Sequence, residues 1–142
     1  MLNSPRLKIL LGTLITFACG ATAMADAITV TDVAGREITL DAPAERVILG
    51  EERQIYLLGL LEPEAPFAHV VGWREDFSQA DPDNYARYAE RFPEIEAIPT
   101  FGGFKDGTFD VEQAASLNPD VVLMNIEAKA ATEDAAYDDK LA

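Results

Sequence analysis

The sequence has few of the side chains that hold metals or carry nucleophilic chemistry, with one histidine and one cysteine among 142 residues. Zinc- and manganese-type sites need several histidines and carboxylates that converge, so direct coordination of a bare metal ion is not expected. His69 lies in an apolar predicted strand, which favours a core residue. A Ser-His-Asp set, a Cys–His pair and a dinucleotide-binding glycine motif are also missing. These absences argue against an enzyme.

Basic residues are scarce as well. Lys and Arg number 11 against 25 Asp and Glu, which gives a formal net charge of −14. So acidic a surface repels nucleic acid and anionic lipid headgroups, because neither finds a basic patch that would release its counterions. We therefore expect no nucleic-acid partner. The charge suits a secreted protein, and it would also suit docking on a basic partner.

The N-terminus lacks an apolar run long enough to cross a membrane as a helix, which takes about 20 residues. The stretch from Ile9 to Ala18 is only about half that length. It follows a short basic segment and precedes the Ala-x-Ala motif at 23–25, an arrangement typical of a secretory signal peptide. We expect residues 1–25 to be removed on export to the periplasm. The mature domain, residues 26–142, would not insert into the membrane. The alternative to a signal peptide is that the N-terminal residues form a buried helix.

Cys19 permits a second interpretation of this N-terminus, because a lipoprotein signal places a cysteine after an apolar segment and a small residue. Ala18 fits that pattern, but Thr16 stands where such signals usually carry leucine, and bulky Phe17 follows it. We expect cleavage after Ala25 to remove Cys19 and two basic residues. The mature chain would then have no cysteine for a disulfide. Its nine Lys and Arg against 25 Asp and Glu would give a net charge of −16.

Hydrophobic periodicity in the mature chain predicts an α/β fold, a parallel sheet flanked by helices with an N-terminal β-hairpin. Apolar and polar residues alternate over 28–32 and 37–40, which predicts two half-buried hairpin strands. Short apolar runs predict strands buried on both faces at 46–50, 69–73 and 121–124. Helical spacing and capping signals predict helices over 51–61, 81–92 and 110–117, and from about Thr132. Strands that alternate with helices indicate a parallel sheet covered on both faces.

The mature chain contains two groups of short motifs. The first group comprises Ile28–Asp32, Gly35-Arg36, Pro43 and Arg46-Val47. The second and more specific group is Phe109–Glu112 followed by Leu117–Val122. In their order and spacing these motifs resemble the periplasmic binding proteins for iron-siderophores, haem and vitamin B12. In that family a helix carries a glutamate at this place, and a Lys-Pro-Asp or Asn-Pro-Asp turn leads into the next strand. The resemblance covers the whole mature chain.

The resemblance implies two α/β lobes joined by a long rigid helix, with the solute in the crevice between them. Members are considerably longer than this chain, so residues 26–142 would be the N-terminal lobe, with the helical connector and the second lobe missing. The implied function is a monomeric receptor that captures a ferric siderophore and delivers it to an inner-membrane ABC permease. Such a receptor catalyses nothing and needs no cofactor of its own.

Other identities stay open on the residues alone. The cargo could be haem or a cobalamin, and Tyr56 would be one candidate for a haem ligand. A secreted α/β enzyme or a metal-site protein could share the sheet and carry its site in a part beyond this chain. A free-standing acidic interaction module would also fit.

Ligands of open α/β sheets bind beyond the carboxyl ends of the parallel strands. Residues 50–53, residues 73–76 and the segment after Met124 are predicted to lie there. Trp73 and Arg74 are the first candidates for ligand contact. Tryptophan offers apolar area and a donor, and arginine offers a planar fork for carboxylate or catecholate oxygens. The alternative is a core tryptophan beside an arginine that pairs with a neighbouring acid, Glu75 or Asp76.

Three further residues are candidates for ligand contact. Arg53 lies in the first turn of a predicted helix, where a cation opposes the helix dipole by up to about 1 kcal/mol, so an anionic ligand would explain it. A solvated charge offset by Glu51 and Glu52 is the alternative. Phe104 and Lys105 belong to a glycine-rich loop whose backbone could approach a ligand. A plain turn with one buried phenylalanine would also explain that loop.

Glu112 has a different predicted role. The resemblance implies that one glutamate on each lobe meets arginines on the permease, and Glu112 matches the position on the N-terminal lobe. On local grounds, an acid in the first turn of a helix needs only the helix dipole to explain it.

Overall fold

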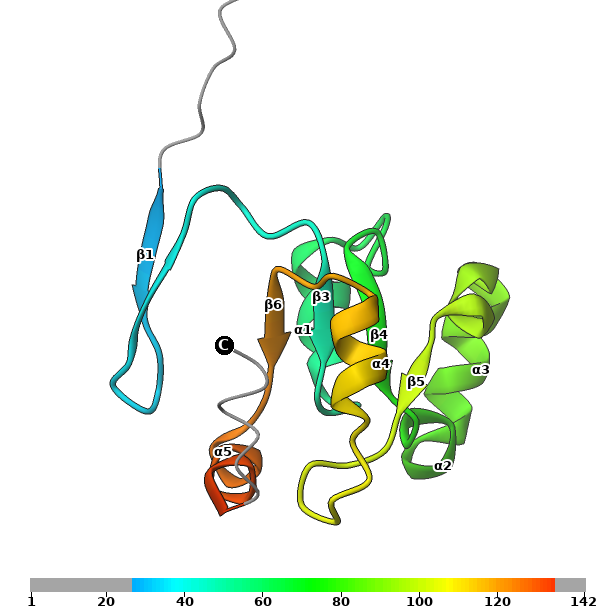
Figure 1. The fold of residues 1–142 in the computed structure, drawn as a ribbon. Coiled ribbons are helices and arrows are strands. Elements are labelled where there is room, and N and C mark those ends of the chain that lie inside the picture. Colours follow the sequence, from blue (N-terminus) through cyan, green and yellow to red (C-terminus); the bar gives the residue numbers. More distant parts are fainter. Residues whose placement is uncertain (1–26, 135–142) are drawn as a thin grey trace, which may run out of the picture.

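The computed structural model describes residues 27–134, so the predicted cleavage site at Ala25 and Cys19 lie outside the described residues. The chain forms a parallel sheet, helices on both of its faces, and a separate hairpin (Figure 1). The strands are β1 (Ile28–Thr31), β2 (Glu37–Leu40), β3 (Val47–Leu49), β4 (Val70–Arg74), β5 (Thr100–Phe101) and β6 (Val121–Leu123). The helices are α1 (Gln54–Leu61), α2 (Phe77–Ala80), α3 (Pro82–Arg91), the 3-10 helix η1 (Pro93–Ala97), α4 (Val111–Ser116) and α5 (Ile126–Asp134).

The four-stranded sheet has the order β5-β4-β3-β6, and every neighbouring pair is parallel. The chain moves outward from β3 to β4 and β5, and then returns to the other side of β3 with β6. The strand order therefore reverses between β3 and β6. This confirms the predicted α/β fold, and it defines the switch point at which open sheets of this kind bind ligands.

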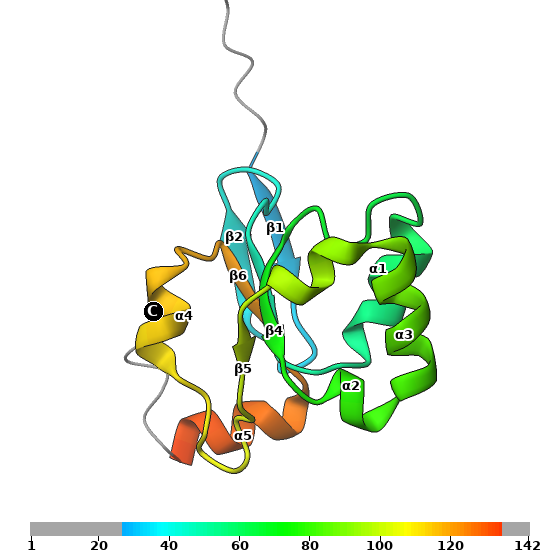
Figure 2. The same cartoon turned by 90° about the vertical axis from the view of Figure 1, so that its right-hand side faces the viewer.

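Two apolar cores lie on the two faces of the sheet. Along β3, Leu49 belongs to one core and Ile48 to the other, as the alternation of a strand buried on both faces requires. Helices α1, α2 and α3 lie on one side of the sheet, and α4 and α5 lie on the other (Figure 2). The first core contains Leu49, Ile55, Phe67, Val70, Trp73, Phe77, Phe92 and Ile95. The second contains Ile48, Phe101, Phe104, Phe109, Val111, Ala114 and Ala128.

Capping side chains position two of the helices as the sequence predicts. Asp81 accepts a hydrogen bond from the backbone N–H of Asn84 at 3.2 Å, and Pro82 occupies the first turn of α3. Asp110 accepts from the backbone N–H of Gln113 at 2.9 Å and starts α4. These bonds satisfy N–H groups that have no partner within the helix.

Some boundaries differ from the prediction. Helix α1 begins at Gln54 because residues 51–53 form a bend and turn, which puts Arg53 at its N-cap. Helix α5 begins at Ile126 and not near Thr132. The short elements β5, α2 and η1 were not predicted, since two to five residues carry little periodic signal.

Three burial predictions were wrong. Strand β6 is not buried on both faces, because it is an outer strand of the sheet, and Leu123 is 38% exposed. His69 is exposed and not in the core, because the turn after Pro66 extends through it and β4 begins only at Val70. Strand β1 is exposed along its whole length, whereas β2 alternates as predicted. The hairpin pairs only with itself within the described part of the chain, so no sheet covers β1. No helix in residues 27–134 has the length and apolar character to cross a membrane.

Candidate functional site

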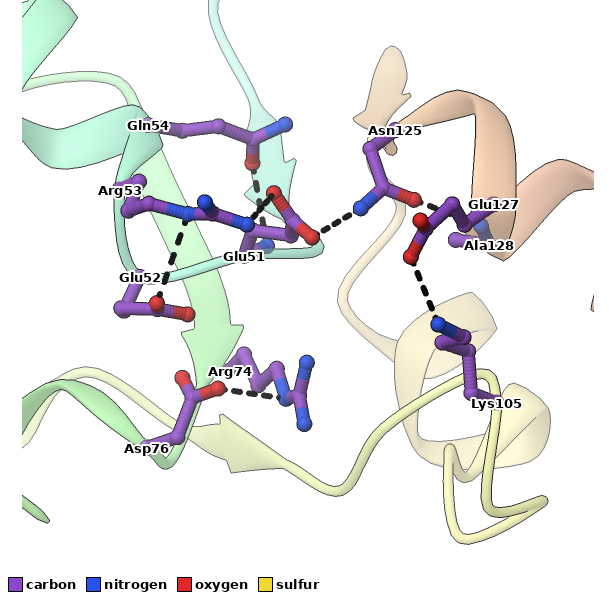
Figure 3. A network of polar contacts seen from close by, with 10 residues as sticks. All are labelled: Glu51, Glu52, Arg53, Gln54, Arg74, Asp76, Lys105, Asn125, Glu127 and Ala128. Carbon is purple, nitrogen blue, oxygen red and sulfur yellow. Dashed lines mark hydrogen bonds and ion pairs between the residues drawn. The ribbon is translucent and has the colours of Figure 1, made fainter. Parts of the chain in front are cut away.

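The carboxyl ends of the parallel strands bring together a set of polar side chains that we call the strand-end cluster (Figure 3). They come from the segments that follow β3, β4, β5 and β6, at or near the ends of those strands. The cluster consists of Glu51, Glu52, Arg53, Gln54, Arg74, Asp76, Lys105, Asn125 and Glu127. Because all four strands run in one direction, segments far apart in the sequence meet at this edge of the sheet. This is the edge of the sheet at which the sequence predicts ligand contact.

The centre of the cluster is the switch point between β3 and β6. Asn125 donates a hydrogen bond from its side-chain amide to Glu51, and Glu51 accepts it on Oε1. The backbone N–H of Gly50 donates to the carbonyl oxygen of Leu123 at 2.7 Å. A Cβ at position 50 would lie 2.6 Å from that same oxygen, so the close approach of the two strand ends requires glycine there.

Arg53 lies over this edge with 70% of its side chain exposed. Its Nη2 is 3.4 Å from Glu51 Oε2, and its Nε is 3.7 Å from Glu52 Oε1. The two acids therefore offset the arginine's charge, as the surface-charge interpretation expected. The guanidinium remains accessible from solvent.

Arg74 lies deeper, with 31% of its side chain exposed. Its Nε is 2.8 Å from Asp76 Oδ2. Its Nη2 would be 3.2 Å from a Cβ placed on Gly103, so the missing side chain of that glycine leaves room for the guanidinium. Arg74 also lies near Asp106, whose pKa is lowered chiefly by hydrogen bonds from Thr108 and in part by the charge of Arg74.

Trp73 is in the first core, with 3% of the residue exposed. Its ring packs edge-on against Phe67 and Phe77, each with ring centroids 5.7 Å apart. Neighbouring residues of a strand point to opposite faces, so Arg74 reaches the edge while Trp73 does not. The alternative interpretation, a core tryptophan beside an arginine that pairs with Asp76, describes this arrangement.

The glycine-rich loop after β5 also places one of its two candidate residues in a core and the other at the surface. Phe104 is 3% exposed and stacks on Phe109 in the second core, with ring centroids 4.1 Å apart. Lys105 is largely exposed, and its Nζ lies 2.6 Å from Glu127 Oε2 on α5. This ion pair lowers the pKa of Glu127. Thus the loop contributes a cation to the strand-end cluster and an aromatic ring to the core.

Asp76 has the most unusual environment in the cluster. Burial raises its pKa to about 6, assisted by Glu52, which can accept a hydrogen bond from protonated Asp76 and whose negative charge disfavours ionisation, while the charge of Arg74 opposes the shift. Its Oδ1 is buried and, among residues 27–134, has no hydrogen-bond partner. A carboxyl group in this setting keeps its proton to a higher pH than an ordinary aspartate does.

The sequence-based prediction missed six members of this cluster as site residues. Glu51, Glu52 and Asp76 entered it only as counterions of the arginines. Asn125 and Glu127 belong to the predicted segment after Met124 and Gln54 to the predicted helix over 51–61, but none of the three was singled out. The available signal was position, since all six lie within four residues after the end of a predicted strand.

Other candidates lie outside the cluster. Glu112 is exposed in the first turn of α4. Tyr56 donates its hydroxyl to Asp81, the N-cap of α3, and this bond raises the pKa of the tyrosine. The phenol is thus tied into the helical layer beside the sheet. Within residues 27–134, no group of three or more His, Cys, Asp or Glu could hold a metal ion.

No protein-family model and no curated protein matches this chain, but solved structures do. The chain is 31% identical to the TroA-like periplasmic binding protein FepB from Veillonella parvula, with a TM-score of 0.70 over 80% of this chain and 34% of that one. A periplasmic solute binding protein from Veillonella parvula DSM 2008 has a TM-score of 0.60 at 15% identity, over 81% of this chain and 33% of that one.

A third match is the molybdate periplasmic binding protein MolA of Haemophilus influenzae, with a TM-score of 0.54 at 21% identity, over 76% of this chain and 32% of MolA. The last two matches support the fold alone. The chain spans about one third of the length of the proteins it matches. With its parallel sheet, its hairpin and its 31% identity to FepB, the chain is similar to the TroA-like periplasmic binding proteins and has the fold of one lobe of them.

Proposed function

We propose that this chain is a solute-binding lobe of a periplasmic receptor that serves an ABC importer and captures an anionic iron complex such as a ferric siderophore. The similarity to FepB supports a binding protein and not an enzyme. The observation that carries the proposal is the position of three cationic side chains at the switch point of the sheet, where this type of fold binds ligands.

Arg53, Arg74 and Lys105 would contact the oxygens of the solute. Each already lies near a carboxylate of the cluster, but each has further N–H groups that can donate to a ligand. Arginine suits carboxylate and catecholate oxygens because its planar fork makes paired hydrogen bonds. Trp73 and Phe104 would support the site indirectly. Their rings pack in the two cores and hold Arg74 and the glycine-rich loop in position.

The binding test uses the full chain and a set of named probes: a ferric catecholate, a ferric hydroxamate, ferric citrate, haem and cobalamin. Trp73 is the only tryptophan, so quenching of its fluorescence reports binding next to Arg74. We expect an anionic ferric complex to bind, and Arg74→Ala to weaken it about tenfold or more, since a charge-assisted hydrogen bond contributes about 1.5–3 kcal/mol.

The matched control is Arg91→Ala. This arginine lies on α3, away from the strand-end cluster, and pairs with Glu64 at 3.6 Å. Its removal is expected to leave binding unchanged. Equal affinities for wild type, Arg74→Ala and Lys105→Ala would contradict the proposed site. If haem or cobalamin bound preferentially, that compound would be the solute of this receptor in place of a ferric siderophore.

The permease contact is the second part of the proposal, and it involves Glu112. A carboxylate exposed at the start of α4 can meet a basic surface without rearrangement of the core. We expect Glu112→Arg in the complete receptor to lower uptake at least about tenfold, because like charges across an interface cost several kcal/mol. Solute affinity should not change. Glu90→Arg, at an exposed site on α3, is the control, and a normal uptake rate for Glu112→Arg would refute the contact.

A further inference from the structure

Two carboxylic acids lie within hydrogen-bonding reach of each other in the strand-end cluster (Figure 3). Glu52 follows β3 and Asp76 follows β4, and only 16% and 25% of their side chains are exposed. Asp76 Oδ2 faces Arg74 Nε at 2.8 Å. Its Oδ1 is buried without a partner in the described part of the chain. An acceptor buried without a donor is costly, and a proton held between the two acids would provide that donor.

Each of the two acids is also a counterion of one arginine. Asp76 pairs with Arg74, and Glu52 Oε1 lies 3.7 Å from Arg53 Nε. The two arginines therefore flank a carboxyl pair that cannot ionise fully without placing two negative charges side by side. Such a pair releases its protons as a unit and not as two independent groups.

We propose that Glu52 and Asp76 share one proton, and that this proton sets the positive charge that Arg53 and Arg74 offer to a solute. Arg53 also pairs with Glu51, so with the proton bound the two guanidiniums and the three acids are neutral together. After its loss the same five side chains have an excess of one negative charge. The part of the inference that concerns solutes rests on the proposed function, whereas the shared proton does not.

The remaining charged groups around the pair come from every segment that reaches this edge. They are Glu51 from the turn after β3, Lys105 from the glycine-rich loop and Glu127 from α5. Asp106 of the same loop lies near Arg74, and Glu75 is the residue before Asp76. Lys105 and Glu127 form their own ion pair, and Asp106 is held ionised by hydrogen bonds from Thr108.

The sign of the pH effect follows from the raised pKa of Asp76. Burial, and then the contact with Glu52, move that pKa to about 6, so the shared proton is lost as pH rises through this value. Above pH 6 the cluster's own carboxylates compete with an anionic solute for both arginines. Affinity for an anion should therefore increase as pH falls from 7.5 to 5.5. We expect a change of about threefold to tenfold, since a full pKa unit of linkage corresponds to a factor of ten.

The shared proton can be measured without any ligand. Side-chain carboxyl carbons of the isotope-labelled full chain are followed by NMR from pH 3 to pH 8.5. We expect Asp76 to titrate near pH 6, and the Nε–H resonance of Arg74 to move with the same midpoint. In Glu52→Gln the midpoint of Asp76 should fall by about one unit, because the neighbouring charge is gone while burial remains. An ordinary midpoint in wild type, or no change in Glu52→Gln, would overturn the inference.

The effect on anions is tested with sulfate, which stays a dianion across this range and so isolates the protein's titration. Shifts of the Nε–H resonances of Arg53 and Arg74 should report tighter sulfate binding at pH 5.5 than at pH 7.5. Asp76→Asn should remove that difference. Equal affinity at both pH values, or no sulfate binding at pH 5.5, would overturn the link between proton and anion. The proposed function would remain standing on its own test with ferric complexes.

Discussion

Replacing Trp73 with alanine is expected to lower the free energy of unfolding by about 3–5 kcal/mol, the usual cost of removing a large aromatic side chain from a core. Trp73 is almost fully buried and lies between Phe67 and Phe77 in the first core. Its loss would open a cavity beside β4 and remove two edge-to-face ring contacts, each contributing about 0.5–1.5 kcal/mol beyond burial. Urea denaturation followed by circular dichroism measures the change without relying on tryptophan fluorescence.

Trp73→Phe distinguishes the structural role from direct ligand contact. The indole Nε1 is buried without a partner in residues 27–134, so phenylalanine removes no hydrogen bond. We expect this variant to lose less than about 1.5 kcal/mol, as for other conservative core replacements. Solute binding, measured by equilibrium dialysis, should stay close to wild type. A large loss of binding with preserved stability would show that the indole itself contacts the solute.

Gly50→Ala is expected to destabilise the lobe by about 3 kcal/mol, at the upper end of the range for overpacked interiors. The added Cβ would lie 2.6 Å from the carbonyl oxygen of Leu123 and 2.9 Å from the ring of Phe104. The first of these atoms is backbone and the second belongs to the core, so neither can move away cheaply. The two strand ends would separate, and the contact between Glu51 and Asn125 should weaken with them.

Gly103→Ala is the matched control for this substitution. Its Cβ would approach only the ends of flexible side chains, Asp106 at 3.1 Å and Arg74 at 3.2 Å. We expect a loss of stability below about 1 kcal/mol, within the ordinary range for a substitution of this kind. If thermal or urea unfolding showed equal losses for the two alanine variants, the tight approach of β3 and β6 at Gly50 would not be the cause.

Several features of the fold followed from local patterns alone. Apolar runs located β3, β4 and β6, and the capping aspartates Asp81 and Asp110 located the starts of α3 and α4. These signals need only neighbouring residues, because strand periodicity and cap bonds are made within a few positions of the chain. Their alternation was enough to predict a parallel sheet, and with it the edge at which a ligand would bind.

The side chains at that edge were harder to assign, because burial depends on partners from distant segments. The sequence nominated Trp73 and Arg74 together, since Trp73 ends a predicted strand and Arg74 directly follows it. Only the packing of α2 and α3 against β4 decided that the indole enters a core while the guanidinium reaches the cluster. Likewise, Glu51 and Asn125 show no local signal of a contact, because β3 and β6 become neighbours only through the strand order.

The sequence by itself thus determined the class of fold, the acidic and cysteine-poor character of the chain, and the edge of the sheet that carries its charges. Tertiary structure alone decided which of those charges meet. The carboxyl pair of Glu52 and Asp76 exists because two turns from neighbouring strands end side by side, and its shared environment is a property of that contact. Local periodicity sets the direction of a side chain, whereas its neighbours, and hence its charge state, come from the packing of the whole lobe.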